Sequence, residues 1–246
     1  MRAVGRKDSG RRKVLSTSSP YDLIIFDCDG VLVDSEALAC VVHAEVLTEY
    51  GYTISAEQVH ERFLGRSARE ARLEVESELG RAFPDSYTAQ LRATIDRVFG
   101  EQLQPVPHIF EALDRLSRRI CVASSGTPTR IRSSLGTTGL IGRFDPHLFS
   151  AMQVERGKPA PDLFLFAAAQ MDTPPRRCVV IEDSVPGVTA AHAAGMTVIG
   201  FTGGSHCRPG DADRLRAAGA SIVIGDMRAL PGLIEPSLDH AEISAI

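Results

Sequence analysis

Five short apolar segments restrict the folds that are open to this chain of 246 residues. Each segment is four to six residues long, and together they are rich in Ile, Val and Cys. Polar residues do not alternate with apolar ones inside them, which predicts strands that are buried on both faces, as in a parallel sheet. The segments lie at 22–26, 119–123, 178–181, 196–201 and 221–224.

Helical patterns separate the strand segments in the second half of the chain. Leu163, Phe164 and Phe166, for example, give one of these patterns a broad apolar face. Alternating strands and helices predict a doubly wound, mainly parallel α/β sheet. The expected helices are 107–118, 128–135, 162–171 and 186–194.

A different pattern occupies residues 35–104, where strand segments vanish and helical stretches take over. A helical block of this size, inserted after the first strand, indicates a separate all-helical cap. We therefore predict a core domain from 20–34 and 105–235 and a cap domain from 35–104. The helices expected in the cap are 36–50, 56–62, 67–79 and 84–102.

Charge separates residues 1–19 from the rest of the chain. This leader holds six basic residues and one acid, so the remainder carries a net charge of −9 within a total of −4. A body this acidic excludes a typical nucleic-acid binder. The leader lacks an apolar core, so it is not a secretory signal. We expect a disordered basic leader, while a transit peptide, an upstream start and a weak contact for polyanions stay open.

Hydropathy and cysteine usage describe the expected setting. No apolar run approaches the roughly 18 residues that cross a bilayer, so we expect no membrane partner. The five cysteines form no CxxC pair, which favours a reducing cytoplasm. Cys28 is expected to fill space rather than to react. The sequence leaves a monomer and a small homo-oligomer open.

Two aspartates follow the first strand segment. Asp27 comes directly after Phe26, and Asp29 directly precedes Gly30. A carboxylate can attack phosphorus to form an aspartyl-phosphate, provided that a dication screens the anions. Asp29, two residues further along an extended backbone, can reach the leaving oxygen as general acid and then base. An ordinary Asp-x-Asp-Gly turn is the competing interpretation.

A hydroxyl and an amine follow two further strand segments. Ser124 and Ser125 come after the segment 119–123, before a helix capped by Thr127, and such a helix start can hold a phosphate. Lys158 lies in Gly-Lys-Pro a few residues after the strand-like run 148–150, and its ammonium could pair with Asp27 and phosphoryl oxygens. A plain turn and a solvated lysine are the alternatives.

A pair of acids ends the segment 178–181. Glu182 and Asp183 would repel each other and the acids at 27 and 29, a conflict that a bound dication resolves. Helix capping by Asp183 is the competing interpretation. Mg²⁺ prefers such hard oxygen ligands, so the four segments together predict a phosphoryl-transfer site with Mg²⁺.

The order of these motifs resembles that of the haloacid dehalogenase-like (HAD) hydrolases with a helical cap. The resemblance covers about residues 21–230 and depends chiefly on the runs 26–36 and 157–164. It implies that Asp27 is the nucleophile, Asp29 the acid/base and Lys158 a catalytic cation. It also implies that Ser124, Ser125 and Lys158 bind phosphate. The implied Mg²⁺ ligands are Asp27, Asp183 and the backbone carbonyl of Asp29, with Glu182 acting directly or through water.

Within the family, the resemblance favours a phosphatase for a small phosphorylated metabolite, a sugar or sugar-acid phosphate of the 6-phosphogluconate kind. The alternative is a β-phosphoglucomutase-like phosphomutase, disfavoured because Ala39 and Ala68 stand where that group carries a histidine and an arginine. A dehalogenase lacks the acid at position 29, and a non-catalytic binding protein would not keep all the acids. Gly65 and Arg66, between two cap helices, are the expected substrate contacts, with a solvent-facing arginine as the alternative.

Overall fold

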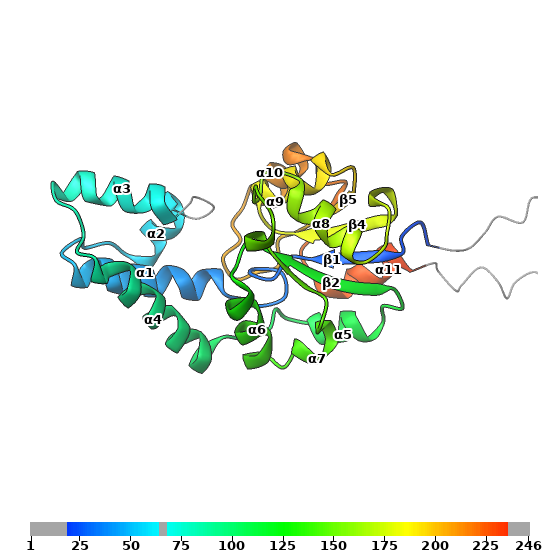
Figure 1. The fold of residues 1–246 in the computed structure, drawn as a ribbon, viewed down its shortest axis with the longest axis horizontal. Helices are drawn as coiled ribbons and strands as arrows, with labels where there is room; N and C mark the ends of the chain where they lie inside the picture. The colour runs from blue at the N-terminus through cyan, green and yellow to red at the C-terminus, as the bar shows by residue number, and fades with distance from the viewer. Residues whose placement is uncertain (1–18, 64–67, 236–246) are drawn as a thin grey trace, which may run out of the picture.

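The computed structural model describes residues 19–63 and 68–235, which contain one six-stranded sheet. Its strands are all parallel and lie in the order β3-β2-β1-β4-β5-β6 (Figure 1). From β1 the strand order runs in one direction to β3 and in the opposite direction to β6, so it reverses between β1 and β4, as in a doubly wound fold. The predicted parallel sheet is confirmed, with strands β1 Leu23–Phe26, β2 Arg119–Ser124, β3 Leu148–Ser150, β4 Cys178–Glu182, β5 Thr197–Phe201 and β6 Ile222–Ile224.

Both faces of the sheet are buried, as the uninterrupted apolar strands require. In β1, Ile24 and Phe26 belong to one apolar cluster, whereas Leu23 and Ile25 belong to the other. Helices on the two sides complete these clusters (Figure 1). The first side carries α5 Ile109–Asp114, α6 Pro128–Thr137, α7 Ile141–Phe144 and α11 Leu230–Ile234; the second carries α8 Asp162–Gln170, α9 Val185–Ala193 and α10 Asp211–Ala218.

One expected helix is much shorter than predicted. The pattern at 107–118 gives only α5, from Ile109 to Asp114. The expected range abutted the next strand and left no residues for the connection. Residues 115–118 instead turn the chain back into β2, and Ser117 donates hydrogen bonds from its backbone N–H and hydroxyl to Glu235.

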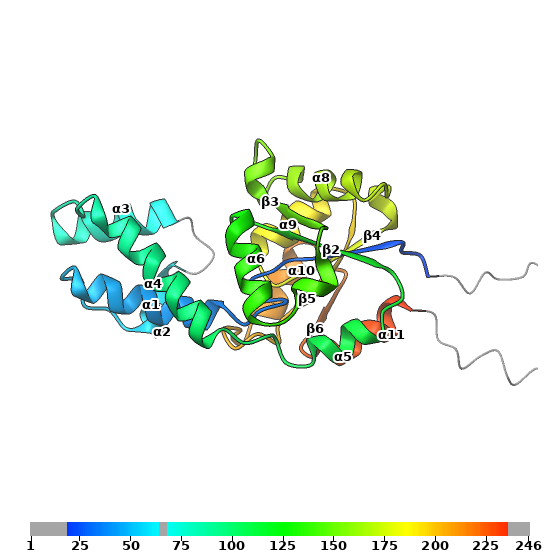
Figure 2. The same ribbon diagram turned by 60° about the horizontal axis from the view of Figure 1, so that its bottom comes forward.

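Helices α1 to α4 lie to one side of the sheet layers (Figures 1 and 2). Between residues 35 and 104, apart from the undescribed 64–67, no strand interrupts them. Their positions agree with the expected helices within a few residues. They are α1 Glu36–Glu49, α2 Ala56–Phe63, α3 Ala68–Leu79 and α4 Ser86–Gln102.

The two connections to these helices run side by side. Val33 and Pro105 form an isolated bridge, and the backbone N–H of Asp34 donates to the carbonyl of Gln104 over 2.9 Å. The chain therefore leaves and re-enters the sheet layers at one place, the arrangement expected of an inserted domain. The division into a core of 20–34 with 105–235 and a cap of 35–104 remains our prediction.

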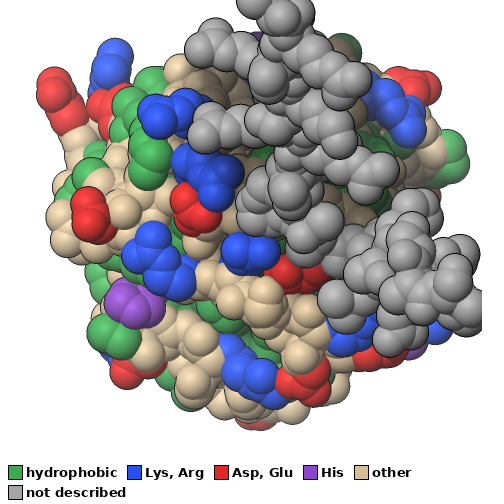
Figure 3. All heavy atoms as spheres, turned by 90° about the vertical axis from the view of Figure 1, so that its right-hand side faces the viewer, with side chains coloured by type: hydrophobic (Ala, Val, Ile, Leu, Met, Phe, Trp, Pro, Cys, Tyr) green, Lys and Arg blue, Asp and Glu red, His purple; other side chains and the backbone are tan. Residues whose placement is uncertain are grey.

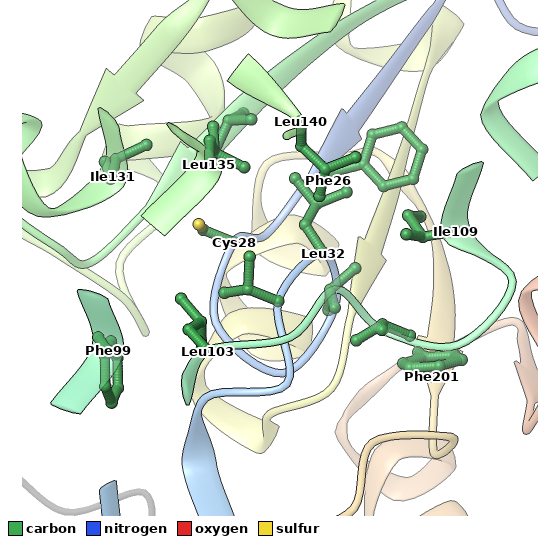
Figure 4. Close-up of a cluster of buried hydrophobic side chains, with 14 of the residues drawn as sticks. Phe26, Cys28, Leu32, Phe99, Leu103, Ile109, Ile131, Leu135, Leu140 and Phe201 are labelled. Carbon is green, nitrogen blue, oxygen red and sulfur yellow. The ribbon is translucent and has the colours of Figure 1, made fainter. Parts of the chain in front are cut away.

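An apolar cluster continues from the sheet through these connections (Figure 4). It joins Phe26 of β1 to Leu32 and Leu103 of the connections and to Phe99 of α4. Cys28 lies in the same cluster with 1% of its surface exposed, and its thiol is free. Its burial agrees with a space-filling role.

The surface opposite the cap carries both signs of charge. Where its described atoms are visible, Lys and Arg side chains lie interspersed with Asp and Glu (Figure 3). Across the described ranges, every helix is too short or too polar to traverse a lipid bilayer. Residues 1–18, and with them nearly all of the predicted leader, lie outside the described ranges.

Candidate active site

The reversal of strand order between β1 and β4 brings the predicted acids together. Asp27 follows β1, and its backbone N–H donates to the carbonyl of Ile181 in β4 over 3.0 Å. Glu182 ends β4 and Asp183 comes next. Ligands of open α/β sheets bind beyond the carboxyl ends of strands at such a reversal, so this edge is the candidate active site.

Lys158 forms hydrogen bonds to the acids at the ends of β1 and β4. Its Nζ donates to Asp27 Oδ1 over 2.7 Å and to Glu182 Oε1 over 2.6 Å. The ammonium also lies 5.0 Å from the ring centroid of Phe164. Burial alone lowers the pKa of Lys158, but the two carboxylates outweigh it and raise the pKa above its usual value. Lys158 is therefore a buried, fixed positive charge, and the solvated-lysine alternative is wrong.

Glu182 is fully buried and uses both carboxylate oxygens within the protein. Oε1 accepts from Lys158, and Oε2 accepts from the backbone N–H and hydroxyl of Ser184, each over 2.9 Å. Gly187, in the first turn of α9, must be glycine because a Cβ there would overlap the Glu182 carboxylate. This carboxylate is thus held in one position, beneath Lys158.

Asp183 does not cap the following helix, so that competing interpretation is wrong. Ser184 is the N-cap of α9, and its hydroxyl accepts from the backbone N–H of Gly187 over 3.1 Å. Asp183 turns instead toward His206, whose Nε2 lies 3.1 Å from Asp183 Oδ2. Gly30 allows this approach, because its φ is +78° and a Cβ there would overlap the Asp183 carboxylate.

His206 lies at 203–207, after β5, where the sequence favours an ordinary loop and leaves a place at the edge of the active site as the alternative. Burial lowers the pKa of His206, but the hydrogen bonds and charges of Asp183 and Cys207 together outweigh burial and raise the pKa to about 10. The loop follows β5, the strand beside β4. The contact with Asp183 shows that this loop does border the site, as the alternative reading of the strand end allowed.

Asp29 contacts two groups outside its own motif. Its Oδ1 accepts from the hydroxyl of Ser35 over 2.8 Å and lies 3.6 Å from a guanidinium nitrogen of Arg130. The guanidinium of Arg130 also lies 4.7 Å from the ring centroid of Phe99 in α4. The sequence analysis does not single out Arg130, although this residue stands in the first turn of the helix that follows Ser124 and therefore faces the same edge.

The two serines at the end of β2 differ sharply, Ser124 being its last residue and Ser125 the next one. Ser124 is buried, and its hydroxyl accepts from the backbone N–H of Gly126 over 3.0 Å. A Cβ on Gly126 would lie 3.4 Å from Ser124 Oγ and 3.9 Å from Asp29 Oδ2, so both side chains border one spot. Ser125 is exposed. Thr127 caps α6 as predicted, accepting from the backbone N–H of Arg130.

Three carboxylates at this edge could share a cation. Asp27, Glu182 and Asp183 each offer an oxygen, and these atoms lie within 4.8 Å of one another. Burial raises the pKa of Asp27 well above its usual value, and the charges of Glu182 and Asp183 raise it further against the effect of Lys158. Lys158 and the protonated imidazole of His206 bring two positive charges against these three buried acids. The negative charge that is left over and the hard oxygen donors fit a dication such as Mg²⁺.

Cap and core meet beside these residues. Nε2 of His60, in α2, donates to the backbone carbonyl of His206 over 2.8 Å. The hydroxyl and backbone N–H of Ser205 donate to Asp34, which directly precedes the cap. The proposed substrate contacts Gly65 and Arg66 lie outside the described residues.

Comparison with known proteins decides the family. The family model described as "haloacid dehalogenase-like hydrolase" matches residues 21–195, a stretch that includes every strand-end group described above except His206. The chain belongs to the haloacid dehalogenase-like hydrolases. The helical insertion and parallel sheet described above are those expected from this HAD resemblance, and the enzyme is a phosphoric monoester hydrolase of the family.

Two curated HAD relatives illustrate the similarity. The 6-phosphogluconate phosphatase of Escherichia coli is 31% identical over 192 residues, covering 78% of this chain and 87% of the relative. The phosphorylated carbohydrates phosphatase of Thermotoga maritima is 34% identical over 184 residues, covering 71% and 82%.

Two solved HAD structures share the fold. A conserved haloacid dehalogenase-like protein of unknown function from Agrobacterium tumefaciens is 45% identical with a TM-score of 0.80, covering 87% of this chain and 97% of that one. A HAD family hydrolase from Deinococcus radiodurans, solved with bound phosphate and sodium, is 30% identical with a TM-score of 0.75, covering 89% and 100%.

Proposed function

We propose that this HAD enzyme hydrolyses a small phosphomonoester, a sugar or sugar-acid phosphate, through an aspartyl-phosphate on Asp27. The observation that carries the proposal is the buried carboxylate of Asp27, 2.7 Å from the Lys158 ammonium at the reversal of the sheet. A carboxylate fixed beside a cation is suited to attack an electrophile that carries negative charge. The names of the two curated relatives support the substrate class.

The first step joins Asp27 to phosphorus. Asp27 Oδ attacks the phosphoryl group, the bond from phosphorus to the ester oxygen breaks, and protonated Asp29 gives its proton to the departing oxygen. Ser35 and Arg130 hold the Asp29 carboxyl in place. Lys158 offsets the charge that gathers on the phosphoryl oxygens, and we assign Ser124 and the N–H groups at the start of α6 to their binding.

The second step frees the enzyme. Asp29, now a carboxylate, takes a proton from water, and the water oxygen attacks phosphorus while the bond to Asp27 breaks. Inorganic phosphate leaves, and both aspartates return to their starting forms. The cap excludes bulk water during these steps.

Asp27, Asp183 and the backbone carbonyl of Asp29 would hold Mg²⁺. When bound, the ion screens the repulsion between the attacking carboxylate and the phosphate and makes the phosphorus more electrophilic. Glu182 has both oxygens engaged by Lys158 and Ser184. We therefore assign Glu182 to orienting Lys158, with any contact to the ion made through water.

A phosphate-release screen tests the proposal. Sugar, sugar-acid, polyol and nucleoside monophosphates are offered to the wild-type enzyme with Mg²⁺ and with chelator, and turnover is expected only with the metal. Asp27→Asn is expected to lower kcat by at least about 10⁴-fold with an unchanged circular dichroism spectrum. Turnover by this variant at the wild-type rate would refute the nucleophile. Isomerised sugar phosphate that needs a bisphosphate activator, in place of free phosphate, would establish the phosphomutase alternative.

A further inference from the structure

The proposed reaction assigns no role to His206, the buried histidine that contacts Asp183. Only 5% of its surface is exposed, although it lies in the loop that follows β5. It also stands beyond residues 21–195, the stretch that the family model matches. Because a polar side chain is costly to bury unless partners hold it, the contacts of His206 indicate what it does.

The imidazole of His206 engages one of the two oxygens of the Asp183 carboxylate. Nε2 donates to Asp183 Oδ2 over 3.1 Å. The second oxygen, Oδ1, accepts no hydrogen bond from any residue that the structure describes. One oxygen of Asp183 is therefore fixed by the protein, while the other stays available to a cation held by the cluster of Asp27, Glu182 and Asp183.

The two ring nitrogens of His206 have different surroundings. Nδ1 is buried and has no hydrogen-bond partner among the described residues. Nε2 faces Asp183 and, as a weaker partner, the Cys207 thiol at 3.5 Å. An Nε2–H donor exists both in the protonated ring and in the neutral tautomer that this contact favours. The hydrogen bond to Asp183 therefore does not depend on the charge of His206.

Two glycines pack directly against this ring. A Cβ on Gly204 would lie 2.7 Å from Cε1 and 2.8 Å from Nδ1 of His206, and a Cβ on Gly30 would lie 3.0 Å from Cε1. The imidazole thus fills a slot between two stretches of backbone. A rotation of the ring away from Asp183 would require one of these backbones to move.

Hydrogen bonds from outside hold the loop that carries His206. Ser205 donates to Asp34 Oδ1 from its backbone N–H over 3.0 Å and from its hydroxyl over 2.9 Å. The backbone carbonyl of His206 accepts from His60 of α2 over 2.8 Å. The loop is therefore anchored to the cap and to the connection that enters it, and it presents the imidazole at one place.

We propose that His206 is a positioning residue for the metal site, which holds Asp183 through Oδ2 and leaves Oδ1 to the ion. The inference rests on the proposed function, since that function gives Asp183 its role as a Mg²⁺ ligand. His206 acts through Asp183 and does not itself contact the ion. A group that orients a metal ligand in this way typically contributes about 10–100-fold to metal affinity.

Calorimetric titration of the metal-free enzyme with Mg²⁺ alone tests this role. His206→Ala is expected to raise the dissociation constant of Mg²⁺ by about 10–100-fold. His206→Gln is expected to stay within about threefold of wild type, because its amide nitrogen lies the same number of bonds from Cβ as Nε2 and donates without a charge. His206→Asn, whose shorter side chain brings its amide only to the position of Nδ1, is expected to resemble His206→Ala.

Gly204→Ala displaces the ring without removing it. The added Cβ overlaps His206, and we expect a dissociation constant for Mg²⁺ that is about tenfold higher. Gly225→Ala, in the loop after β6, is the matched control. Neither glycine has a positive φ, and a Cβ on Gly225 meets only Thr202 Oγ1 at an ordinary 3.8 Å, so its Mg²⁺ affinity is expected to equal that of wild type.

The outcomes separate this inference from the phosphatase proposal. Mg²⁺ binding by His206→Ala at wild-type affinity or tighter would overturn the positioning role, and tighter binding would show that the imidazole competes with the ion. An equal loss in His206→Gln and His206→Ala would also overturn it. Each result leaves the phosphatase proposal standing if the wild type releases phosphate.

The converse result is equally distinct. The expected order of Mg²⁺ affinities, with no phosphate released from any ester, would support the role of His206 and overturn the phosphatase proposal. A wild-type enzyme that binds no Mg²⁺ would overturn the role of His206 together with the metal assignment. If His206→Ala does not fold, the contrast between His206→Gln and His206→Asn and that between the two glycine variants still decide the matter.

Discussion

The side chains of the catalytic edge are tightly paired with one another, whereas those of the cap interior leave space between them. At the edge, Lys158 pairs with Asp27 and Glu182 over 2.7 and 2.6 Å, and Glu182 has a second partner in Ser184. Inside the cap, small and apolar residues surround an open cavity. The comparison indicates that the edge is organised before substrate arrives, which suits chemistry, whereas the cap leaves room, which suits selection of a leaving group.

The largest effect on stability and turnover is expected from removing the Lys158 ammonium from the catalytic edge. Lys158→Met leaves Asp27 and Glu182 as buried charges without a counterion, which is expected to cost about 3–5 kcal/mol of unfolding free energy. We expect kcat to fall by about 10³-fold as well. Urea denaturation and steady-state kinetics measure the two effects.

Arg156→Met is the matched control for Lys158→Met. Arg156 lies in the same loop, and its pair with Asp162 is exposed. Its loss is expected to change the unfolding free energy by less than about 1 kcal/mol. Equal effects of the two substitutions would mean that the edge is no more tightly organised than the surface.

A substitution at Gly30 tests whether the close approach of the Asp183 carboxylate to Gly30, and not only the positive φ of Gly30, requires a glycine at this position. Gly30→Ala adds a Cβ that overlaps Asp183, and Gly30 has a positive φ. We expect a loss of roughly 3–4 kcal/mol in unfolding free energy and weaker Mg²⁺ binding by calorimetry.

Gly80→Ala supplies the comparison for Gly30. Gly80 also has a positive φ, +67°, but a Cβ there meets nothing within 4 Å. Only strain of about 1 kcal/mol is expected. A similar loss at both glycines would show that the Asp183 carboxylate simply moves aside.

Glu36, between the two regions, predicts a pH dependence. Its folded pKa of about 7 exceeds the ordinary 4.5, so the folded state binds more protons between these values and loses stability as pH rises through them. The cost above pH 7 is up to about 3 kcal/mol. Without metal, Glu36→Gln is expected to gain stability over wild type at pH 8 but not at pH 4. A difference that is constant with pH would contradict this assignment.

Arg130 links the regions and carries the smallest expected effect. Its guanidinium lies between Asp29 and the Phe99 ring of the cap. Arg130→Ala is expected to lower kcat about tenfold through misplacement of Asp29, with little change in KM. Arg132 lies on the same helix as Arg130 and forms an exposed pair with Asp145. Arg132→Ala, which removes this pair, is expected to leave kcat unchanged. Identical kinetics for the two variants would exclude a positioning role for Arg130.

The sequence predicts site residues correctly where a local pattern determines their place in the fold. Apolar runs predict strands, and parallel strands bring their carboxyl ends to one edge, so Asp27, Lys158 and Asp183 could be gathered in advance. The rule also brings the loop after β5 and the start of α6 to this edge, but it does not specify which of their side chains reach the acids. Arg130 extends to Asp29 from the first turn of a helix, and His206 extends to Asp183 from a long loop.

The cap interior could not be predicted for a different reason. Ala39 of α1 and Ala71 of α3 are good helix formers, and the apolar residues within each of these helices are spaced as in any amphipathic helix. Whether four such helices close over a filled interior or leave a cavity depends on how they are placed relative to one another, which periodicity does not specify. Helix 107–118 failed similarly, because its apolar spacing carries no information on where the chain must turn to enter β2.

Trapping the covalent intermediate tests the central claim most directly. The enzyme is mixed with a substrate from the phosphate-release screen in the presence of Mg²⁺, quenched in acid within the first turnover, digested and analysed by mass spectrometry. Our account predicts one added phosphoryl group on Asp27 that is labile to hydroxylamine and missing in Asp27→Asn. Phosphate release at the full rate, with no phosphorylated aspartate or with the group on another residue, would contradict it.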